Sequence, residues 1–335
     1  MNIASNGQNG SQIAMIESLK GRVSPQHRLR NAIRSGEFIV TAEVMPPKGG
    51  SPAHMLEMAE HLKDWVHAVN VTDGSRAVLR MSSLACSVLL KQAGIEPICQ
   101  MTGRDRNAIA IQADLMGAHA LGLNNILTLT GDPIKAGDHP KGKAVHELDS
   151  IRMLRLIRLL NDGSDFNEKA MADGPLDIFA GAAVDPQSRS WSGLQSRFEK
   201  KLAAGAQFFQ SQLISDFDKL EKFMDKIAAG SDRPILAGIF LLKSAKNAAF
   251  INRCVPGVDI PQHIIDRLEA AKDPLREGMK IAAEQVQAAR QLCQGVHMMA
   301  VRREDLIPEI LEMAGVAPQD RSQQQEKVGA LSGVV

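Results

Sequence analysis

Phe38-Ile39-Val40-Thr41-Ala42-Glu43 is a short apolar run that ends in a carboxylate, and similar runs recur along the chain. Such runs are typical of strands that are buried on both faces of a parallel sheet. The predicted strands are Phe38–Glu43, Ala68–Thr72, Pro97–Thr102, Asn125–Thr130, Asp177–Ala182, Phe208–Gln212, Ile235–Ile239 and Gly295–Ala300. Helical patterns lie between most of them, as at Ser51–Lys63, Arg80–Ala93, Arg106–Ala118, Leu148–Leu160 and Phe217–Ala229. In a chain of 335 residues this alternation predicts an α/β fold, a (β/α)8 TIM barrel with additional helices.

A doubly wound open sheet is the main structural alternative. It usually carries a glycine-rich fingerprint after its first strand, whereas Glu43 is followed here by Val-Met-Pro-Pro. Further helices are predicted at Pro25–Arg34, with Ser24 as N-cap, and at Ser244–Arg253, Ile260–Ala271 and Arg276–Cys293. We expect a flexible arm over residues 1–24, a single catalytic barrel over 25–316 and a polar tail over 317–335.

The bulk composition excludes several classes of partner. The formal net charge is +1, which gives no electrostatic reason to expect nucleic acid or an anionic membrane. The four cysteines form no C-x-x-C pair and have no histidine at zinc-ligand spacing, so we expect reduced thiols and no metal site. The chain also lacks a signal-peptide pattern and an apolar run long enough to cross a bilayer. These features predict a cytoplasmic protein.

Glu43, Asp132 and Gln212 each stand where a predicted strand gives way to a loop. In a parallel barrel, such positions lie at the catalytic rim. A partly buried carboxylate can act as a general acid, and an anion beside a substrate can stabilise a developing cation. Two carboxylates and an amide on one cavity therefore predict acid chemistry on a nitrogen-rich small molecule. The simpler alternatives are a solvated pair of Glu43 with Lys48 and a turn in which Asp132 bonds its own backbone.

Other polar residues stand beside further predicted strands. Thr72 closes the predicted second strand, and Gln100 opens the stretch that closes the third; these segments could bind a polar cofactor or only form turns. Lys200 and Lys201 lie on the helix before the sixth strand, where a solvated charged face is the alternative to a phosphate contact. The loop at 131–146 is long, and long βα loops in barrels usually build the site.

Together these motifs resemble the methylenetetrahydrofolate reductase family, from about residue 30 to residue 315. The resemblance is carried by Ala42–Lys48, Asn70–Gly74, Leu129–Pro133, Ala204–Gln212, Pro256–Pro261 and Gly295–Ala300. Members of this family are (β/α)8 barrels that bind FAD. They reduce 5,10-methylenetetrahydrofolate to 5-methyltetrahydrofolate by ping-pong hydride transfer from NADH or NADPH. The resemblance thus implies a flavoprotein oxidoreductase of one-carbon metabolism and methionine biosynthesis, which commonly self-associates into a homo-oligomer.

The resemblance also implies roles for individual residues. Glu43 matches the general acid that assists opening of the folate ring to an iminium. Asp132 matches the carboxylate that stabilises this cation and influences the flavin, and Gln212 matches an amide that contacts the pterin. The positions that match flavin contacts are Thr72, Gln100, Thr130, Gly131, Asp132, Lys200 and Lys201.

The resemblance is weaker at contacts to the flavin and the nicotinamide. Gln100 replaces a His, Gly181 and Asp185 replace a Tyr and a His, and Ala245 replaces a Phe. Two alternatives follow from these departures and from the versatility of the fold. One is the same folate reduction with another electron donor or an electron-transfer partner subunit. The other is a non-redox barrel that binds folate or transfers a methyl group.

Overall fold

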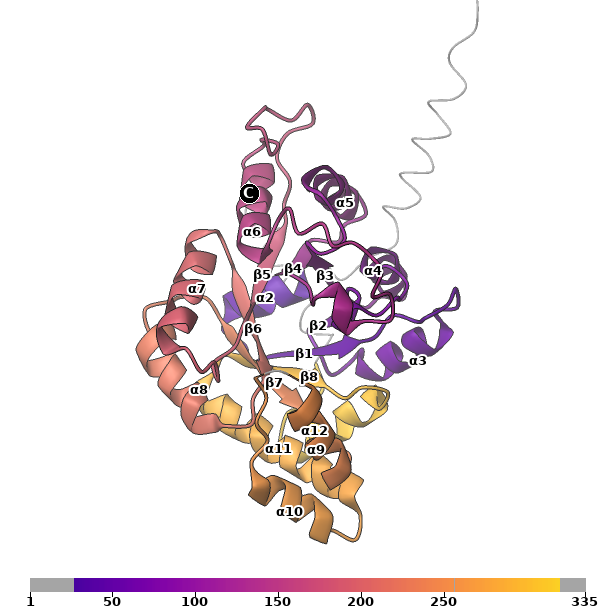
Figure 1. The fold of residues 1–335 in the computed structure, drawn as a ribbon, viewed down its shortest axis with the longest axis vertical. Helices are drawn as coiled ribbons and strands as arrows, with labels where there is room; N and C mark the ends of the chain where they lie inside the picture. The colour runs from indigo at the N-terminus through magenta and orange to yellow at the C-terminus, as the bar shows by residue number, and fades with distance from the viewer. Residues whose placement is uncertain (1–26, 256, 320–335) are drawn as a thin grey trace, which may run out of the picture.

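The computed structural model describes residues 27–255 and 257–319. The predicted arm at 1–24 lies outside the described residues, as do residues 320–335 of the tail predicted at 317–335. Parallel strands form a closed barrel in which each strand pairs with its neighbours in chain order, and β1 pairs with β8 (Figure 1). The prediction of a (β/α)8 barrel, rather than a doubly wound sheet, is confirmed.

The strands lie within two residues of their predicted limits. They are β1 (Ile39–Val44), β2 (Ala68–Val71), β3 (Pro97–Thr102), β4 (Asn125–Leu129), β5 (Phe179–Val184), β6 (Phe208–Leu213), β7 (Ile235–Phe240) and β8 (Gly295–Met299). Their buried, mostly apolar sequences leave helices as the only elements that can cover the outside of the barrel.

Helices surround the barrel (Figure 1). The α-helices are α2 (Arg28–Ser35), α3 (Ala53–Leu62), α4 (Ser83–Gln92), α5 (Ala108–Ala120), α6 (Ser150–Asn161), α7 (Trp191–Ala203), α8 (Phe217–Phe223), α9 (Ala245–Cys254), α10 (Gln262–Ala270), α11 (Pro274–Leu292) and α12 (Ile307–Met313). Short helical turns are η1 (Ser75–Ala77), η2 (Ile134–Ala136), η3 (Met224–Ala228) and η4 (Glu304–Leu306). Within the described residues, no helix is both long and apolar enough to span a membrane.

Three details differ from the predicted helices. The helix predicted at 25–34 is interrupted at His27, which has left-handed backbone angles, and α2 begins at Arg28; Pro25 lies outside the described residues. The helix predicted at Phe217–Ala229 changes at Met224 into a π-helical turn. Helix α12 was not predicted; Pro308 in its first turn and Gly315 just beyond its end are the signals that could have located it.

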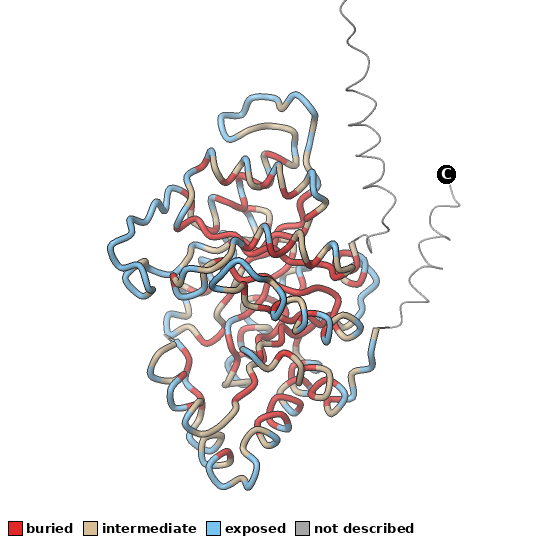
Figure 2. The backbone as a smooth tube through the Cα atoms, turned by 90° about the vertical axis from the view of Figure 1, so that its right-hand side faces the viewer, coloured by how far each residue is buried: buried red, intermediate tan, exposed pale blue. Residues whose placement is uncertain are grey.

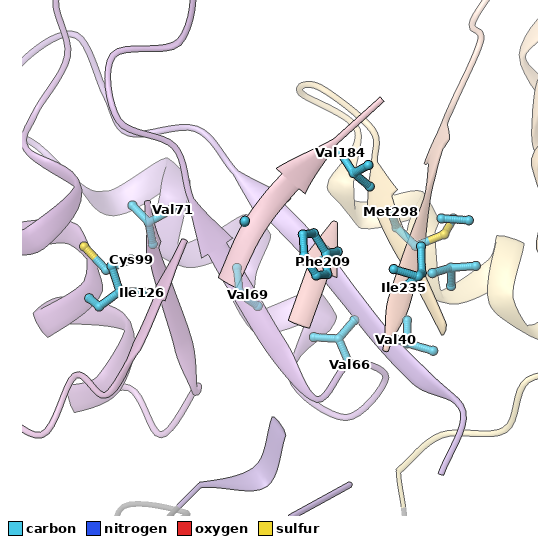
Figure 3. Packing of buried hydrophobic residues seen from close by; sticks show 14 of the residues in the cluster. Val40, Val66, Val69, Val71, Cys99, Ile126, Val184, Phe209, Ile235 and Met298 are labelled. Atoms are coloured by element: carbon cyan, nitrogen blue, oxygen red, sulfur yellow. The ribbon is translucent and has the colours of Figure 1, made fainter. Parts of the chain in front are cut away.

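The main hydrophobic core lies between the barrel and its outer helices. Alternate strand residues such as Val40, Val69 and Phe209 point away from the barrel axis and pack there (Figure 3). Figure 2 shows the resulting buried centre inside an exposed outer layer. The other strand residues point inward, so one face of each strand is free to carry polar groups at the open end.

Helix α2 covers the other end of the barrel. Leu29 packs against inward residues of the strands, among them Ile39 and Phe208. The first turn of α2 is held by the buried carboxylate of Glu96, which accepts hydrogen bonds from the backbone N–H of Arg28 and, at 3.3 Å, of Leu29. The site therefore has a single open side, at the carboxyl ends of the strands.

We predict that the stability of the fold depends on pH through His67, which lies just before β2. Its Nδ1 accepts from the backbone N–H of Val40 at 3.0 Å, and burial is the main cause that lowers its pKa. In the unfolded chain a His titrates at roughly pH 6.5. Because the folded chain holds His67 in its neutral form, protonation favours the unfolded chain, and stability falls as pH drops below that value. We expect His67→Gln to flatten this loss in urea unfolding measured between about pH 7 and pH 5. His61→Gln is the control, since His61 is exposed, and an equal effect in both variants would contradict the assignment.

Candidate active site

Glu43 lies near the carboxyl end of β1 and faces a histidine of the neighbouring strand. Its side chain is 20% exposed, and Oε2 lies 3.7 Å from Nε2 of His297 on β8. The register of the closing strands pairs Thr41 with His297 and so brings the two side chains together. This placement favours a partly buried acid over the alternative of a solvated pair with Lys48, which instead pairs with Asp138 at 3.2 Å.

Polar side chains continue inward from His297. Its Nδ1 lies 3.0 Å from Oγ1 of Thr41, and Nε2 of Gln210 donates to the same oxygen at 3.1 Å. Gln210 is also hydrogen-bonded to Asn70. These residues were not predicted as site residues. For Thr41 and Asn70 the signal was their position two residues before Glu43 and Thr72, on the same strand face.

Asp132 is exposed in the loop after β4. Its Oδ2 accepts from the backbone N–H of Arg76 at 2.7 Å. The alternative of a turn in which Asp132 bonds its own backbone is therefore wrong, because the carboxylate accepts its hydrogen bond from the loop after β2. Arg76 and Ala77 have positive φ angles of 58° and 54°, and such strain in residues other than glycine is common at functional sites.

The predicted flavin-contact residues have different environments. Thr72 is 4% exposed, and its buried Oγ1 has no hydrogen-bond partner among the described residues. Gln100 is buried on β3. Thr130 is exposed, and its hydroxyl accepts from the backbone N–H of Ser150 at 3.3 Å. Of these three side chains, Thr72 offers the clearest unused group for a ligand.

A cavity of about 170 Å³ lies beside the ends of β5 and β6. Its polar lining comes from Asp185, Arg197, Lys201 and Gln212, and its apolar lining includes Phe198. A volume this small suits part of a cofactor, such as a phosphate, since whole ligand pockets usually exceed roughly 300 Å³. The structure thus brings Gln212 and Lys201 together.

The electrostatics of this cavity suit an anion. Lys201 donates to the backbone oxygen of Ala183 at 2.6 Å, and burial, reinforced by the charge of Arg197, lowers its pKa to about 8. Burial also raises the pKa of Asp185, which reduces the cost of an anion nearby. Lys200, by contrast, is exposed on α7 and does not line the cavity.

Gln212 stands at an irregularity in the barrel. The register between β6 and β7 shifts after Gln210, which is the signature of a β-bulge. Ser211 stabilises it by accepting from the N–H of Gly238 at 2.8 Å. A Cβ on Gly238 would lie 2.5 Å from the backbone oxygen of Gln212, so only glycine fits there. Bulges commonly re-aim side chains beside active sites.

Gly181, which stands where the resemblance has a Tyr, leaves no space for a side chain. A Cβ at this position would lie 2.2 Å from the ring of Phe208. That ring stacks on Phe179, with 5.4 Å between centroids. The aromatic volume inside this part of the barrel therefore comes from β6, and no larger side chain can stand at residue 181.

A closed barrel with a single open side, a carboxylate beside a buried histidine and a cationic cavity defines a small-molecule site of the TIM-barrel class. The family model for methylenetetrahydrofolate reductase matches residues 28–315. The chain therefore belongs to the methylenetetrahydrofolate reductase family, and the resemblance read from the sequence is confirmed. Among the described residues, no cluster of His, Cys, Asp and Glu could hold a metal ion.

Curated relatives are distant and longer. A probable methylenetetrahydrofolate reductase (NADPH) of Caenorhabditis elegans is 27% identical over 321 residues, which cover 88% of this chain and 45% of that protein. Methylenetetrahydrofolate reductase 1 of Schizosaccharomyces pombe is 26% identical over 290 residues, or 82% and 45%. The chain thus spans less than half the length of these relatives.

A solved structure confirms the similarity in fold. It is described as an uncharacterized protein from Clostridium thermocellum that binds two copies of 5-methyl-5,6,7,8-tetrahydrofolic acid. The two chains superpose with a TM-score of 0.62 at 14% identity, covering 86% of this chain and 98% of that one.

Gly131 allows a direct test of how the Asp132 loop is packed. It has a φ of +92°, and an added Cβ would lie 2.8 Å from Cβ of Arg104. We expect Gly131→Ala to lower the free energy of unfolding by roughly 1 to 3 kcal/mol. Gly36→Ala is the matched control in urea titrations, because Gly36 has a φ of +71° with no neighbour within 4 Å. Equal losses would show that packing against Arg104 adds nothing.

Proposed function

We propose that this chain reduces 5,10-methylenetetrahydrofolate to 5-methyltetrahydrofolate, with hydride from NADH or NADPH carried by bound FAD. Family membership over residues 28–315 supports the reaction class. The observation that carries the proposal is the placement of Glu43, at the barrel mouth and beside His297. The ligand named for the Clostridium thermocellum protein is the methylated folate that this reaction forms.

Glu43 is the group that we assign to proton transfer. Opening the five-membered ring of the folate breaks a carbon–nitrogen bond, and the nitrogen that leaves needs a proton. A carboxylic acid within reach of that nitrogen supplies it and becomes a carboxylate. Glu43 suits this role because it is partly exposed at the mouth and faces a histidine on its inner side.

Asp132 is assigned to charge stabilisation. Ring opening leaves an iminium, which is a cation. An anion held in place beside it lowers the barrier without needing to move. The hydrogen bond from Arg76 holds the Asp132 carboxylate against the neighbouring loop. Gln212, at the end of β6, is assigned to the pterin, because its amide can both donate to and accept from a heterocycle edge.

The residues present fit FAD. The buried hydroxyl of Thr72 lacks a partner among the described residues, and Arg197 and Lys201 line an anion-suited cavity. Thr72 would hold a polar ring edge, and the two cations would hold a phosphate. When bound, FAD supplies the capacity to accept and deliver a hydride. Lys200 and Gln100 remain proposed contacts.

A different electron donor, such as a partner subunit, is the second candidate. It is favoured by the contacts that depart from the family, namely the closed space at Gly181 and the exposed position of Lys200. Under this reading, the folate chemistry of Glu43 and Asp132 is unchanged. A bound flavin that neither NADH nor NADPH reduces, and that a reductase partner does reduce, would favour it.

Glu43→Gln tests the proton-transfer role. The amide keeps the shape and cannot act as an acid, so we expect folate reduction to fall by roughly 10²- to 10⁴-fold. Reduction of the flavin by NADH or NADPH should be largely retained. The two half-reactions are followed separately by anaerobic stopped-flow absorbance. Glu57→Gln, at an exposed position on α3, is the control, and normal folate turnover in Glu43→Gln would refute the role.

Lys201 tests the anion site. Because its pKa is about 8, it is charged below that pH and neutral above it. We expect FAD affinity, measured by fluorescence quenching, to weaken as pH rises through about 8. Lys201→Met should bind weakly at every pH, and Lys201→Arg should lose the pH dependence. Lys200→Met is compared in parallel, and an equal loss there would argue against the cavity as the phosphate site.

A further inference from the structure

The barrel interior holds a line of buried polar side chains that the proposed chemistry leaves without a role. Thr41 and Asn70 are fully buried, Gln210 is 3% exposed and His297 is 4% exposed. They come from β1, β2, β6 and β8 and end at Glu43. Buried polar groups are costly unless satisfied, so a connected set of this kind specifies one arrangement of donors and acceptors.

The inner end of the line is a reciprocal amide pair. Nδ2 of Asn70 donates to Oε1 of Gln210 at 2.7 Å, and Nε2 of Gln210 donates to Oδ1 of Asn70 at 3.0 Å. The second hydrogen on that nitrogen goes to Oγ1 of Thr41 at 3.1 Å. In this orientation of the pair, Gln210 presents a donor, and not an acceptor, to Thr41.

The Thr41 hydroxyl must then direct its own hydrogen elsewhere. Two acceptors are near it: Nδ1 of His297 at 3.0 Å and the backbone oxygen of Val296 at 3.4 Å. The shorter contact is to His297. A hydroxyl can donate to Nδ1 only when that nitrogen carries a lone pair, so a neutral imidazole carries its hydrogen on Nε2.

We propose that the Asn70–Gln210 pair, acting through Thr41, holds His297 as the tautomer whose Nε2–H points toward the Glu43 carboxylate. The four residues are positioning residues, since none is assigned a contact with substrate. A donor aimed at a carboxylate stabilises the ionised form, which is the form that Glu43 takes after it has given up its proton. The opposite tautomer would place a lone pair against the carboxylate.

Other charges act near Glu43 and must be separated from this effect. Glu304, in the turn after β8, is 4% exposed, and its Oε2 has no hydrogen-bond partner among the described residues. Burial, together with the charge of Glu43, raises the pKa of Glu304, while His54 on α3 acts in the opposite direction. Each pH profile is therefore repeated in a Glu304→Gln background.

The tautomer can be read without any enzyme assay. Long-range proton–nitrogen correlation spectra of histidine-labelled protein separate a ring nitrogen that bears hydrogen from one that does not. We expect the Nε2–H form for His297, whose signals are identified by their loss in His297→Gln. Gln210→Met and Thr41→Val should change the pattern, and Thr41→Ser should keep it. Thr128→Val is the control, because Thr128 is a buried barrel threonine that bonds the backbone of Gly181.

The kinetic consequence rests on the proposed function. In Thr41→Val, we expect the alkaline limb of folate reduction to move up by roughly one pH unit, with flavin reduction unchanged. Thr41→Ser and Thr128→Val should keep the wild-type profile. A merely structural role predicts lower thermal stability with an unchanged tautomer and profile.

Two results would overturn the proposal. One is an Nδ1–H tautomer in the wild-type protein. The other is a tautomer that stays the same in both Gln210→Met and Thr41→Val. Failure of the proposed function looks different: the protein would show the expected tautomer pattern but no folate reduction in any variant.

Discussion

The pairing of β1 with β8 is the contact on which the site depends. It closes the barrel and sets Thr41 opposite His297, which brings Glu43 beside the imidazole. The pairing leaves no room for a side chain at its start, because a Cβ on Gly295 would lie 2.3 Å from the backbone oxygen of Ile39. A change that opened this seam would separate the acid from its histidine before it affected the other strands.

Most of the fold could be predicted because each buried strand is short, apolar and bounded by polar turns. That pattern is local, so β3 and its neighbours were located to within two residues from their own sequences. Helix α12 was not located: Pro308 and Gly315 mark its limits, but the helix is short and its position depends on packing against α11 and α3.

The site was predictable only where a residue's position in its strand decides its direction. Glu43 lies near the carboxyl end of β1 as its position predicts, whereas Gln212 follows a β-bulge and lines the cavity beside α7. The network behind them was not foreseen, because Asn70 and Gln210 meet across the barrel and no local pattern records such a contact. The sequence also could not distinguish Lys200 from Lys201. The two are adjacent on one helix, but only Lys201 lines the cavity.

The amide pair has a consequence for how protons reach the site. Carboxamides neither gain nor lose protons near neutral pH, so the polar line behind Glu43 ends at Asn70 and Gln210 without a reservoir. Helix α2 seals that end of the barrel from water. A substrate that covers the mouth would therefore leave His297 as the member of this line that can exchange a proton with Glu43. Under the proposed chemistry, a proton passed between these two groups stays inside the barrel until the product departs.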